Sequence, residues 1–209
     1  MFVDRTDAGR QLAEVLAGHD VEADVVLAIP RGGLPIGRAV ADELGVPLDV
    51  VAARKIGAPH NPELAVGAVG SDGNVWLNQR LIDELGIDDA YVEEQTERER
   101  AAAEEKVRRY REGREPLELA GKRVVIVDDG VATGATTTAC VRVVKHAGAE
   151  RVVLAVPVGP PDSIERLRNE ADEVIAVETP PHFGAVGQFY ADFGQVSDEE
   201  AMGYLAGDG

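Results

Sequence analysis

Short apolar runs alternate with helical patterns through most of this chain, and this alternation constrains its fold class. Continuous apolar runs of strand length lie at 24–29, 48–53, 123–127, 152–157 and 173–177. Strands of this kind are buried on both faces, which is typical of a parallel sheet covered by helices. We therefore predict an α/β fold with an open, mainly parallel sheet flanked by helices. Ligands of such folds bind at the carboxyl ends of the strands.

The segments between these strands predict the rest of the architecture. Apolar periodicity and terminal glycines indicate helices over 6–17, 34–44, 135–147 and 162–169. The "SDG" turn between two short apolar segments predicts a β-hairpin over 65–78, and the charged segment 88–113 predicts a long helix with a solvated face. On that face, Glu105 and Arg109 have the spacing of an ion pair.

Length and composition limit the class of protein. With 209 residues we expect a single domain over 1–209, with a hairpin plus long helix inserted at 70–113 and a C-terminal hood or tail at 179–209. The chain has no apolar run long enough for a membrane span, its start is charged, and it has one cysteine, Cys140. We expect a cytoplasmic protein with no membrane association.

The net charge of −17 is spread along the whole chain. Such a surface repels nucleic acid, so a general DNA or RNA binder is excluded. Two interpretations of the acidic surface stay open: a face for a basic partner, or a solvated surface suited to a cytoplasm of high salt concentration. The even spread favours the second.

The stretch "VVIVDDGVATGATTTA" (124–139) places two acids and a loop of small residues after a predicted strand. The loop precedes a helix, whose first N–H groups and dipole favour an anion. The candidate phosphate-binding residues are Ala132, Thr133, Gly134, Ala135, Thr136 and Thr137. Carboxylates instead accept hydrogen bonds from hydroxyl groups, which predicts that Asp128 and Asp129 bind a diol.

Ribose 5-phosphate combines a phosphate and a diol at this separation. The Walker pattern needs a lysine at the end of the loop, the dinucleotide pattern needs G-x-G-x-x-G, and this loop has neither. A simpler interpretation also exists, in which Asp129 and Gly130 form a turn and the threonines cap a helix. The combination of acid pair, T-G-x-T and preceding strand favours the sugar phosphate.

"VVIVDDGVATGATT" resembles the motif with which type I phosphoribosyltransferases bind phosphoribosyl pyrophosphate (PRPP). The segments "PRGGLPIG", "LDVVAARKIGAP", "ELAVGAV" and "AVGQFY" extend the resemblance to a less characterised branch of that family over nearly the whole chain. The resemblance implies transfer of a phosphoribosyl group from PRPP to a nucleobase or similar small acceptor, with release of pyrophosphate. It also implies Mg²⁺, with Asp128 and Asp129 as candidate metal ligands, and a homodimer.

The resemblance assigns pyrophosphate to two further loops. In the first, Gly32 and Gly33 expose backbone N–H groups and Arg31 adds a permanent charge. In the second, Arg54 and Lys55 lie in what we expect to be a long lid-like loop. The candidate catalytic residues are Asp128, Asp129, Arg31 and Lys55.

The sequence says less about which residues would bind the acceptor. Four aromatic residues lie within 183–193, and we expect Phe183 and Tyr190 to stack on a planar acceptor, with packing against the core as the alternative. Some relatives have an acidic base four residues after the first acid of the pair, where this chain has Ala132. A non-catalytic PRPP-binding regulatory protein is therefore the main alternative to an enzyme. A different nucleotide enzyme of doubly wound fold ranks last, because the glycine spacing in "PRGGLPIG" is wrong.

Overall fold

A five-stranded parallel sheet forms the centre of the protein in a computed structural model that describes residues 1–111, 115 and 117–207. The strand order is β2-β1-β6-β7-β8, and every neighbouring pair is parallel. The bounds are β1 (Val25–Ala28), β2 (Leu48–Val50), β6 (Arg123–Val127), β7 (Arg151–Val158) and β8 (Glu173–Glu178). The predicted open, mainly parallel sheet flanked by helices is confirmed.

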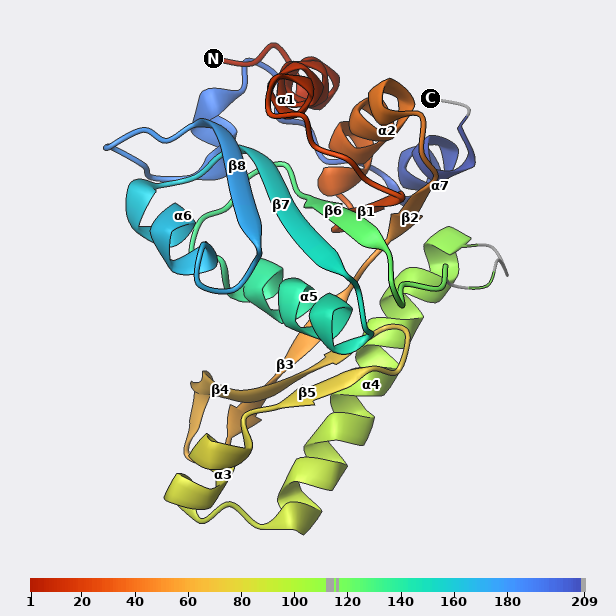
Figure 1. The fold of residues 1–209 in the computed structure, drawn as a ribbon. Helices are drawn as coiled ribbons and strands as arrows, with labels where there is room; N and C mark the ends of the chain where they lie inside the picture. The colour runs from red at the N-terminus through yellow and green to blue at the C-terminus, as the bar shows by residue number, and fades with distance from the viewer. Residues whose placement is uncertain (112–114, 116, 208–209) are drawn as a thin grey trace.

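Helices cover both faces of this sheet (Figure 1). On one face lie α1 (Arg5–Gly18) and α2 (Gly33–Leu44), and on the other lie α5 (Ala135–His146) and α6 (Pro161–Leu167). The strands between them are almost wholly buried, because side chains on both faces pack against helices. These four helices match the predicted ones to within two residues at each end.

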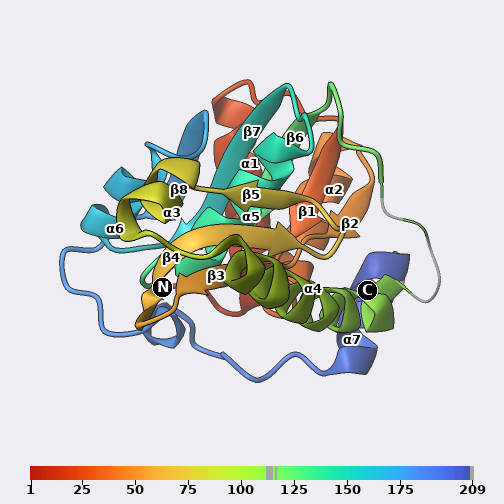
Figure 2. The same cartoon turned by 90° about the horizontal axis from the view of Figure 1, so that it is seen from below.

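A smaller antiparallel sheet packs against the outer side of α5 (Figure 2). It consists of β3 (Ala53–Ala58), β4 (Asn61–Gly70) and β5 (Val75–Leu77), in the order β3-β4-β5. Two helices complete this part, α3 (Gln79–Leu85) and α4 (Asp89–Arg111), and α4 packs against β3 and β4. The predicted end of the long helix at 113 lies outside the described residues.

Two predictions were wrong in this region. The expected strand 48–53 ends at Val50, and a second strand begins at Ala53. The expected lid-like loop that carries Arg54 and Lys55 is a β-hairpin, because β3 pairs antiparallel with β4; Ile56 and Ala58 are buried in it and Arg54 is exposed. The predicted hairpin over 65–78 is confirmed, although its first strand begins at Asn61.

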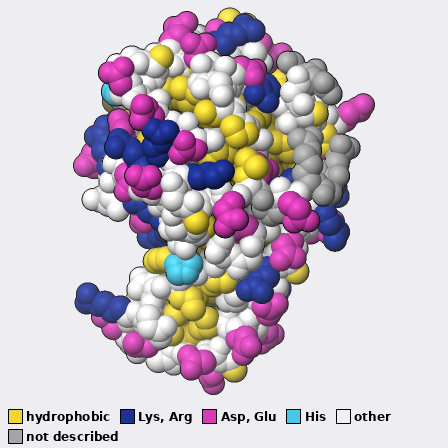
Figure 3. Space-filling view, turned by 45° about the vertical axis from the view of Figure 1, so that its right-hand side comes forward, with side chains coloured by type: hydrophobic (Ala, Val, Ile, Leu, Met, Phe, Trp, Pro, Cys, Tyr) yellow, Lys and Arg dark blue, Asp and Glu magenta, His cyan; other side chains and the backbone are white. Residues whose placement is uncertain are grey.

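The C-terminal tail returns along the main sheet as irregular chain. It contains a short 3₁₀ helix, η1 (Val186–Phe189), and one α-helix, α7 (Asp198–Ala206), which packs against α2 and α4. No helix in the described part of the chain is long and apolar enough to cross a membrane. Acidic side chains are scattered among basic ones over the face drawn in Figure 3.

Candidate functional site

The candidate site lies at the carboxyl ends of β1 and β6. The chain leaves β1 toward β2 on one side, whereas β6 leads to β7 on the other, so the direction of winding reverses between these two strands. Such a switch point opens a crevice in which α/β proteins bind ligands. Arg31, Gly32 and Gly33 follow β1, and Asp128 and Asp129 follow β6. The sheet thus brings two of the predicted loops together.

The two glycines allow these loops to touch. A Cβ atom on Gly32 would lie 2.1 Å from Asp129 Oδ2, and one on Gly33 would lie 2.9 Å from the backbone oxygen of Val127. The first contact involves a side chain and the second involves the strand itself. Close packing against the acid pair therefore requires glycine at both positions. The expectation that Gly33 offers an open N–H was wrong, because this N–H donates to the Ile29 carbonyl at 3.0 Å and Gly33 is buried.

Asp128 and Asp129 have different surroundings. The Asp128 carboxylate accepts a hydrogen bond from the Asp129 N–H at 2.9 Å. Burial raises the pKa of Asp128 well above its usual value, and the neighbouring charge of Asp129 raises it further. Burial also raises the pKa of Asp129, although its hydrogen bond to Arg5 opposes the shift. The protein thus disfavours the ionised forms of both acids, and hydroxyl donors or a cation would favour them.

Arg5 is the site residue that sequence reasoning missed. Its Nε donates to Asp129 Oδ2 at 2.8 Å, and the two side chains are only 12% and 16% exposed. The guanidinium also lies over the ring of Phe193, 3.9 Å from its centroid, and donates to the Gly194 carbonyl. Arg5 comes from α1, more than a hundred residues away in the chain, so no local sequence pattern could have indicated this pair.

The predicted phosphate loop is open. Ala132, Thr133, Ala135 and Thr136 are exposed, whereas Gly134 and Thr137 are buried. Gly134 has a φ of 79° and begins α5, whose first internal hydrogen bond runs from the Thr138 N–H to the Gly134 carbonyl at 2.8 Å. The N–H groups of the three residues between precede that bond, so they are free of intrahelical partners and suited to an anion.

The loop is also anchored from behind. The Ser163 hydroxyl donates to the Ala132 carbonyl at 2.6 Å, and the Val131 N–H donates to the Val158 carbonyl at 2.9 Å. The first bond holds the Ala132 carbonyl toward the protein, the second fixes the chain just before it, and Ala132, Thr133, Ala135 and Thr136 stay exposed. The loop therefore keeps its shape before any ligand arrives.

The cations of β3 face a cavity beside this helix. The cavity has a volume of about 620 Å³ and reaches from Arg54 and Lys55 to Thr136 at the start of α5. Its α4 side carries Glu99, which accepts a hydrogen bond from Arg54 Nε at 2.8 Å, and Arg98. Arg54 remains 52% exposed in this pair. The structure thus places Arg54 and Lys55 across a cavity from the phosphate loop. Gly32 and Gly33 do not line this cavity.

Comparisons with known proteins agree with this geometry. Residues 5–193 match the family described as "Phosphoribosyl transferase domain". The chain belongs to this phosphoribosyl transferase family. It is 46% identical over 205 residues to a Mycobacterium tuberculosis protein named "Putative phosphoribosyl transferase Rv0571c", an alignment that covers 98% of this chain and 46% of that protein. The chain thus spans about half the length of this relative.

Two further relatives are informative. The crystal structure of TT1426 from Thermus thermophilus matches with a TM-score of 0.91 and 46% identity, over 98% of this chain and 97% of that one. An adenine phosphoribosyltransferase from Rhodococcus jostii is 30% identical over 150 residues, which cover 72% of this chain and 65% of that protein. The predicted membership of the phosphoribosyltransferase family is confirmed.

The aromatic residues of the C-terminal tail pack against one another more than we expected of acceptor-binding residues. Tyr190 is only 6% exposed, packs against Phe2 and Phe193, and donates its hydroxyl to the Asp129 carbonyl at 2.6 Å. It supports the acid pair and offers no free face to an acceptor, so the prediction that Tyr190 stacks on the acceptor does not fit the structure. Phe183 is half-buried and stacks on Phe189, with ring centroids 5.3 Å apart.

The acid pair is also the candidate Mg²⁺ site. Within the described residues, no group of three or more His, Cys, Asp or Glu side chains could hold a metal ion. Magnesium commonly takes one or two carboxylates and completes its shell with water and substrate phosphates. Burial and the neighbouring Asp129 raise the pKa of Asp128, and a cation bound partly through substrate oxygens would favour its ionised form. Asp129 would share its charge between the metal and Arg5.

Proposed function

We propose that this protein transfers a phosphoribosyl group from PRPP to a nucleobase or similar acceptor and releases pyrophosphate. The observation that carries the proposal is the meeting of two loops at the β1–β6 switch point, where Gly32 lies against the carboxylate of Asp129. An acid pair, an open phosphate loop and a glycine loop with an arginine follow the carboxyl ends of the neighbouring strands β1 and β6. A phosphorylated sugar with a second anionic group is the ligand that needs all three.

In this proposal each part of PRPP has its own binding group. The 5-phosphate binds the N–H groups and hydroxyls of 132–137, and the ribose hydroxyls donate to Asp128 and to the Asp129 oxygen that Arg5 leaves available. The pyrophosphate lies against the Arg31–Gly33 loop. Arg54 and Lys55 bind it from the hairpin. The cavity that they line reaches Ala135 and Thr136 but not the Arg31–Gly33 loop, so the hairpin must move toward that loop for this contact.

The chemistry follows from this placement. The bond from C1 of the ribose to pyrophosphate breaks as the bond to the acceptor forms, and the sugar gains oxocarbenium character as in other glycosyl transfers. Asp128 and Asp129 lie close to the positive charge that develops on the ring, and Arg31 and Lys55 balance the negative charge of the leaving group. Mg²⁺, when bound, would neutralise part of the pyrophosphate charge.

The alternative is a regulatory protein that binds PRPP without catalysis. Two observations favour it: Ala132 offers no base to the acceptor, and Arg5 already neutralises one of the two acids. Both proteins would bind PRPP, but only the enzyme would exchange isotope between pyrophosphate and PRPP or release pyrophosphate when a base is added.

The test is pyrophosphate release from PRPP and Mg²⁺ with a panel of bases. The panel starts with adenine because one relative is named an adenine phosphoribosyltransferase. Base-dependent release that is abolished in Asp128→Asn would support the enzyme. PRPP binding without release and without isotope exchange would support the regulatory protein, and the absence of PRPP binding would reject both.

A further inference from the structure

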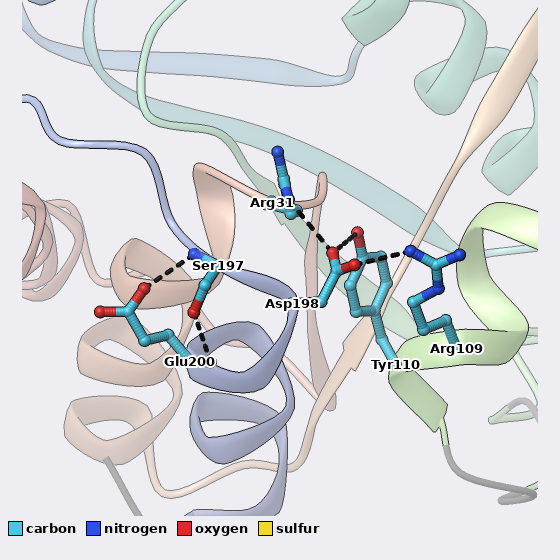
Figure 4. A network of polar contacts seen from close by, with 6 residues as sticks. All are labelled: Arg31, Arg109, Tyr110, Ser197, Asp198 and Glu200. Carbon is cyan, nitrogen blue, oxygen red and sulfur yellow. Dashed lines mark hydrogen bonds and ion pairs between the residues drawn. The ribbon is translucent and has the colours of Figure 1, made fainter.

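Asp198 connects the predicted pyrophosphate loop to the long helix. It is the first residue of α7, and its carboxylate accepts hydrogen bonds from Arg31, Arg109 and Tyr110 (Figure 4). Arg31 comes from the loop after β1, whereas Arg109 and Tyr110 come from the last turn of α4. Three segments that are distant in sequence therefore share one carboxylate.

The contact to Arg31 is the weakest of the three. Arg31 Nη1 lies 3.2 Å from Asp198 Oδ1, whereas Arg109 Nη1 lies 2.6 Å from Asp198 Oδ2. The Arg31 side chain is 41% exposed, and the contact uses only one of its five donors. Tyr110 donates to the same Oδ1 at 3.1 Å and is 5% exposed, so both carboxylate oxygens keep a partner when Arg31 leaves. Arg31 can therefore separate from Asp198 at little cost.

Asp198 is ionised at neutral pH. Its hydrogen bonds from Arg109 and Tyr110 lower its pKa below the usual value. The Ser197–Glu200 capping box fixes the first turn of α7, in which Asp198 lies. The carboxylate is thus a fixed negative charge within reach of the arginine that would bind pyrophosphate.

We propose that Asp198 is a positioning residue of the pyrophosphate site, an internal carboxylate that holds Arg31 before the ligand arrives and competes with pyrophosphate for it. This inference rests on the proposed function, because it takes Arg31 as a pyrophosphate ligand. Pyrophosphate offers Arg31 a bidentate, multiply charged partner in place of a single long contact, so the ligand wins the exchange. Asp198 then stays with Arg109 and Tyr110.

The test measures pyrophosphate binding by calorimetry in the presence of Mg²⁺. Asp198→Asn removes the charge and keeps one oxygen, which can accept from Arg109 or from Tyr110, because the two donate to different oxygens of Asp198. We expect pyrophosphate to bind about two- to fivefold more tightly, which is the range for one partly exposed ion pair. The control is Glu199→Gln, which removes the same charge from the same helix turn at an exposed residue. Arg31→Met should weaken binding about tenfold or more and should abolish the effect of Asp198→Asn.

The outcomes separate the inference from the proposed function. A tightening that is larger in Asp198→Asn than in Glu199→Gln, and that is lost when Arg31 is absent, supports the inference. Unchanged or weaker binding in Asp198→Asn, or the same tightening without Arg31, overturns it while the proposed function stands. Unchanged binding in Arg31→Met, or no pyrophosphate binding in any variant, overturns the assignment of Arg31 and the inference with it. If Asp198→Asn does not fold, Asp198→Ser replaces it, with the same expectations.

Discussion

Asp128 and Asp129 are neighbours in the chain, but only Asp129 has an arginine whose charge depends on it. Burial raises the pKa of both acids; the ion pair with Arg5 opposes the shift at Asp129, whereas the charge of Asp129 adds to the shift at Asp128. A carboxyl group whose pKa is raised by folding favours the folded state when protonated. Its contribution is lost as pH rises from the usual value of 3.8 through the raised pKa.

We therefore expect Asp128→Asn to stabilise the protein at neutral and higher pH. The measurement is the urea midpoint at about pH 4 and about pH 8, and the variant should exceed the wild type by more at the higher pH. Glu199→Gln controls for the loss of one charge. A variant that is less stable than the wild type at the higher pH would show that Asp128 is a structural acid.

Asp129→Asn should have the opposite effect. It leaves Arg5, which is 12% exposed, without its charged partner, so we expect a loss of about 1–3 kcal/mol in the free energy of unfolding. In an Arg5→Met background the same change should cost much less, and a double-mutant cycle measures the difference. Additive effects would contradict a direct pair.

Gly32 is expected to tolerate no side chain. Its backbone has helical angles that alanine can adopt, so any loss must come from the added Cβ, which would lie 2.1 Å from Asp129 Oδ2. We expect Gly32→Ala to lower the free energy of unfolding by about 1–3 kcal/mol and to weaken PRPP binding. Gly18→Ala is the control, because a Cβ there meets no atom within 4 Å, and it should be neutral or stabilising. Equal effects of the two changes would contradict the packing of Gly32 on the acid pair.

At the scale of elements, α4 is fixed to the main sheet by a buried ion pair. Arg111 donates to both oxygens of Asp49, at 3.0 and 3.1 Å, and to the Val50 carbonyl at 3.0 Å. Both side chains are at most 10% exposed. This pair joins the end of the helix that supports the β3–β4 hairpin to the edge strand β2.

We expect Arg111→Met to lower the free energy of unfolding by about 3–5 kcal/mol, because it leaves the Asp49 carboxylate buried without its partner. Chemical denaturation measures the loss. Arg108→Met is the matched control, since Arg108 lies on the same turn with a side chain that is 75% exposed, and it should change stability by less than about 1 kcal/mol. A small effect at Arg111 would mean that water relieves the buried charge.

The helices and strands also show how much of the fold could be predicted from the sequence. The continuous apolar strands and their helices were predicted within a few residues, because burial on both faces leaves a strong periodic signal. The β3 strand was missed because its buried residues, Ala53, Ile56 and Ala58, do not alternate regularly, and its pairing with β4 shifts register at Gly57. The sequence also contains a signal for helix α7, the Ser197–Glu200 capping box, but we predicted no helix from it.

Contacts between distant elements were not predictable from local patterns. The spacing of Glu105 and Arg109 predicted an ion pair along α4, but Arg109 pairs with Asp198 and Arg108 pairs with Glu105. The ion pair between Arg5 and Asp129 likewise joins residues that are far apart in the chain, and the sequence did not predict it. The acids and the phosphate loop could be named in advance because they lie together in one short stretch of sequence, 128–137.

At the scale of the whole molecule, the net charge of −17 affects stability. Acidic groups spread over the surface repel one another, and salt screens that repulsion over a length of about 10 Å at 0.1 M and about 3 Å at 1 M. We expect the urea midpoint to rise between about 0.1 M and about 1 M KCl. A midpoint that falls with salt would favour the other interpretation, in which the acidic surface is kept for a basic partner.

The central claim is that one crevice binds the phosphate, the sugar and the pyrophosphate of PRPP together. The most direct test is calorimetric titration of the wild-type protein with PRPP, ribose 5-phosphate and pyrophosphate, each with Mg²⁺. We predict that PRPP binds more tightly than either fragment, that ribose 5-phosphate and pyrophosphate bind at the same time, and that Asp128→Asn weakens the two sugar ligands while sparing pyrophosphate. Competition between the fragments, or PRPP binding no tighter than pyrophosphate, would contradict the claim.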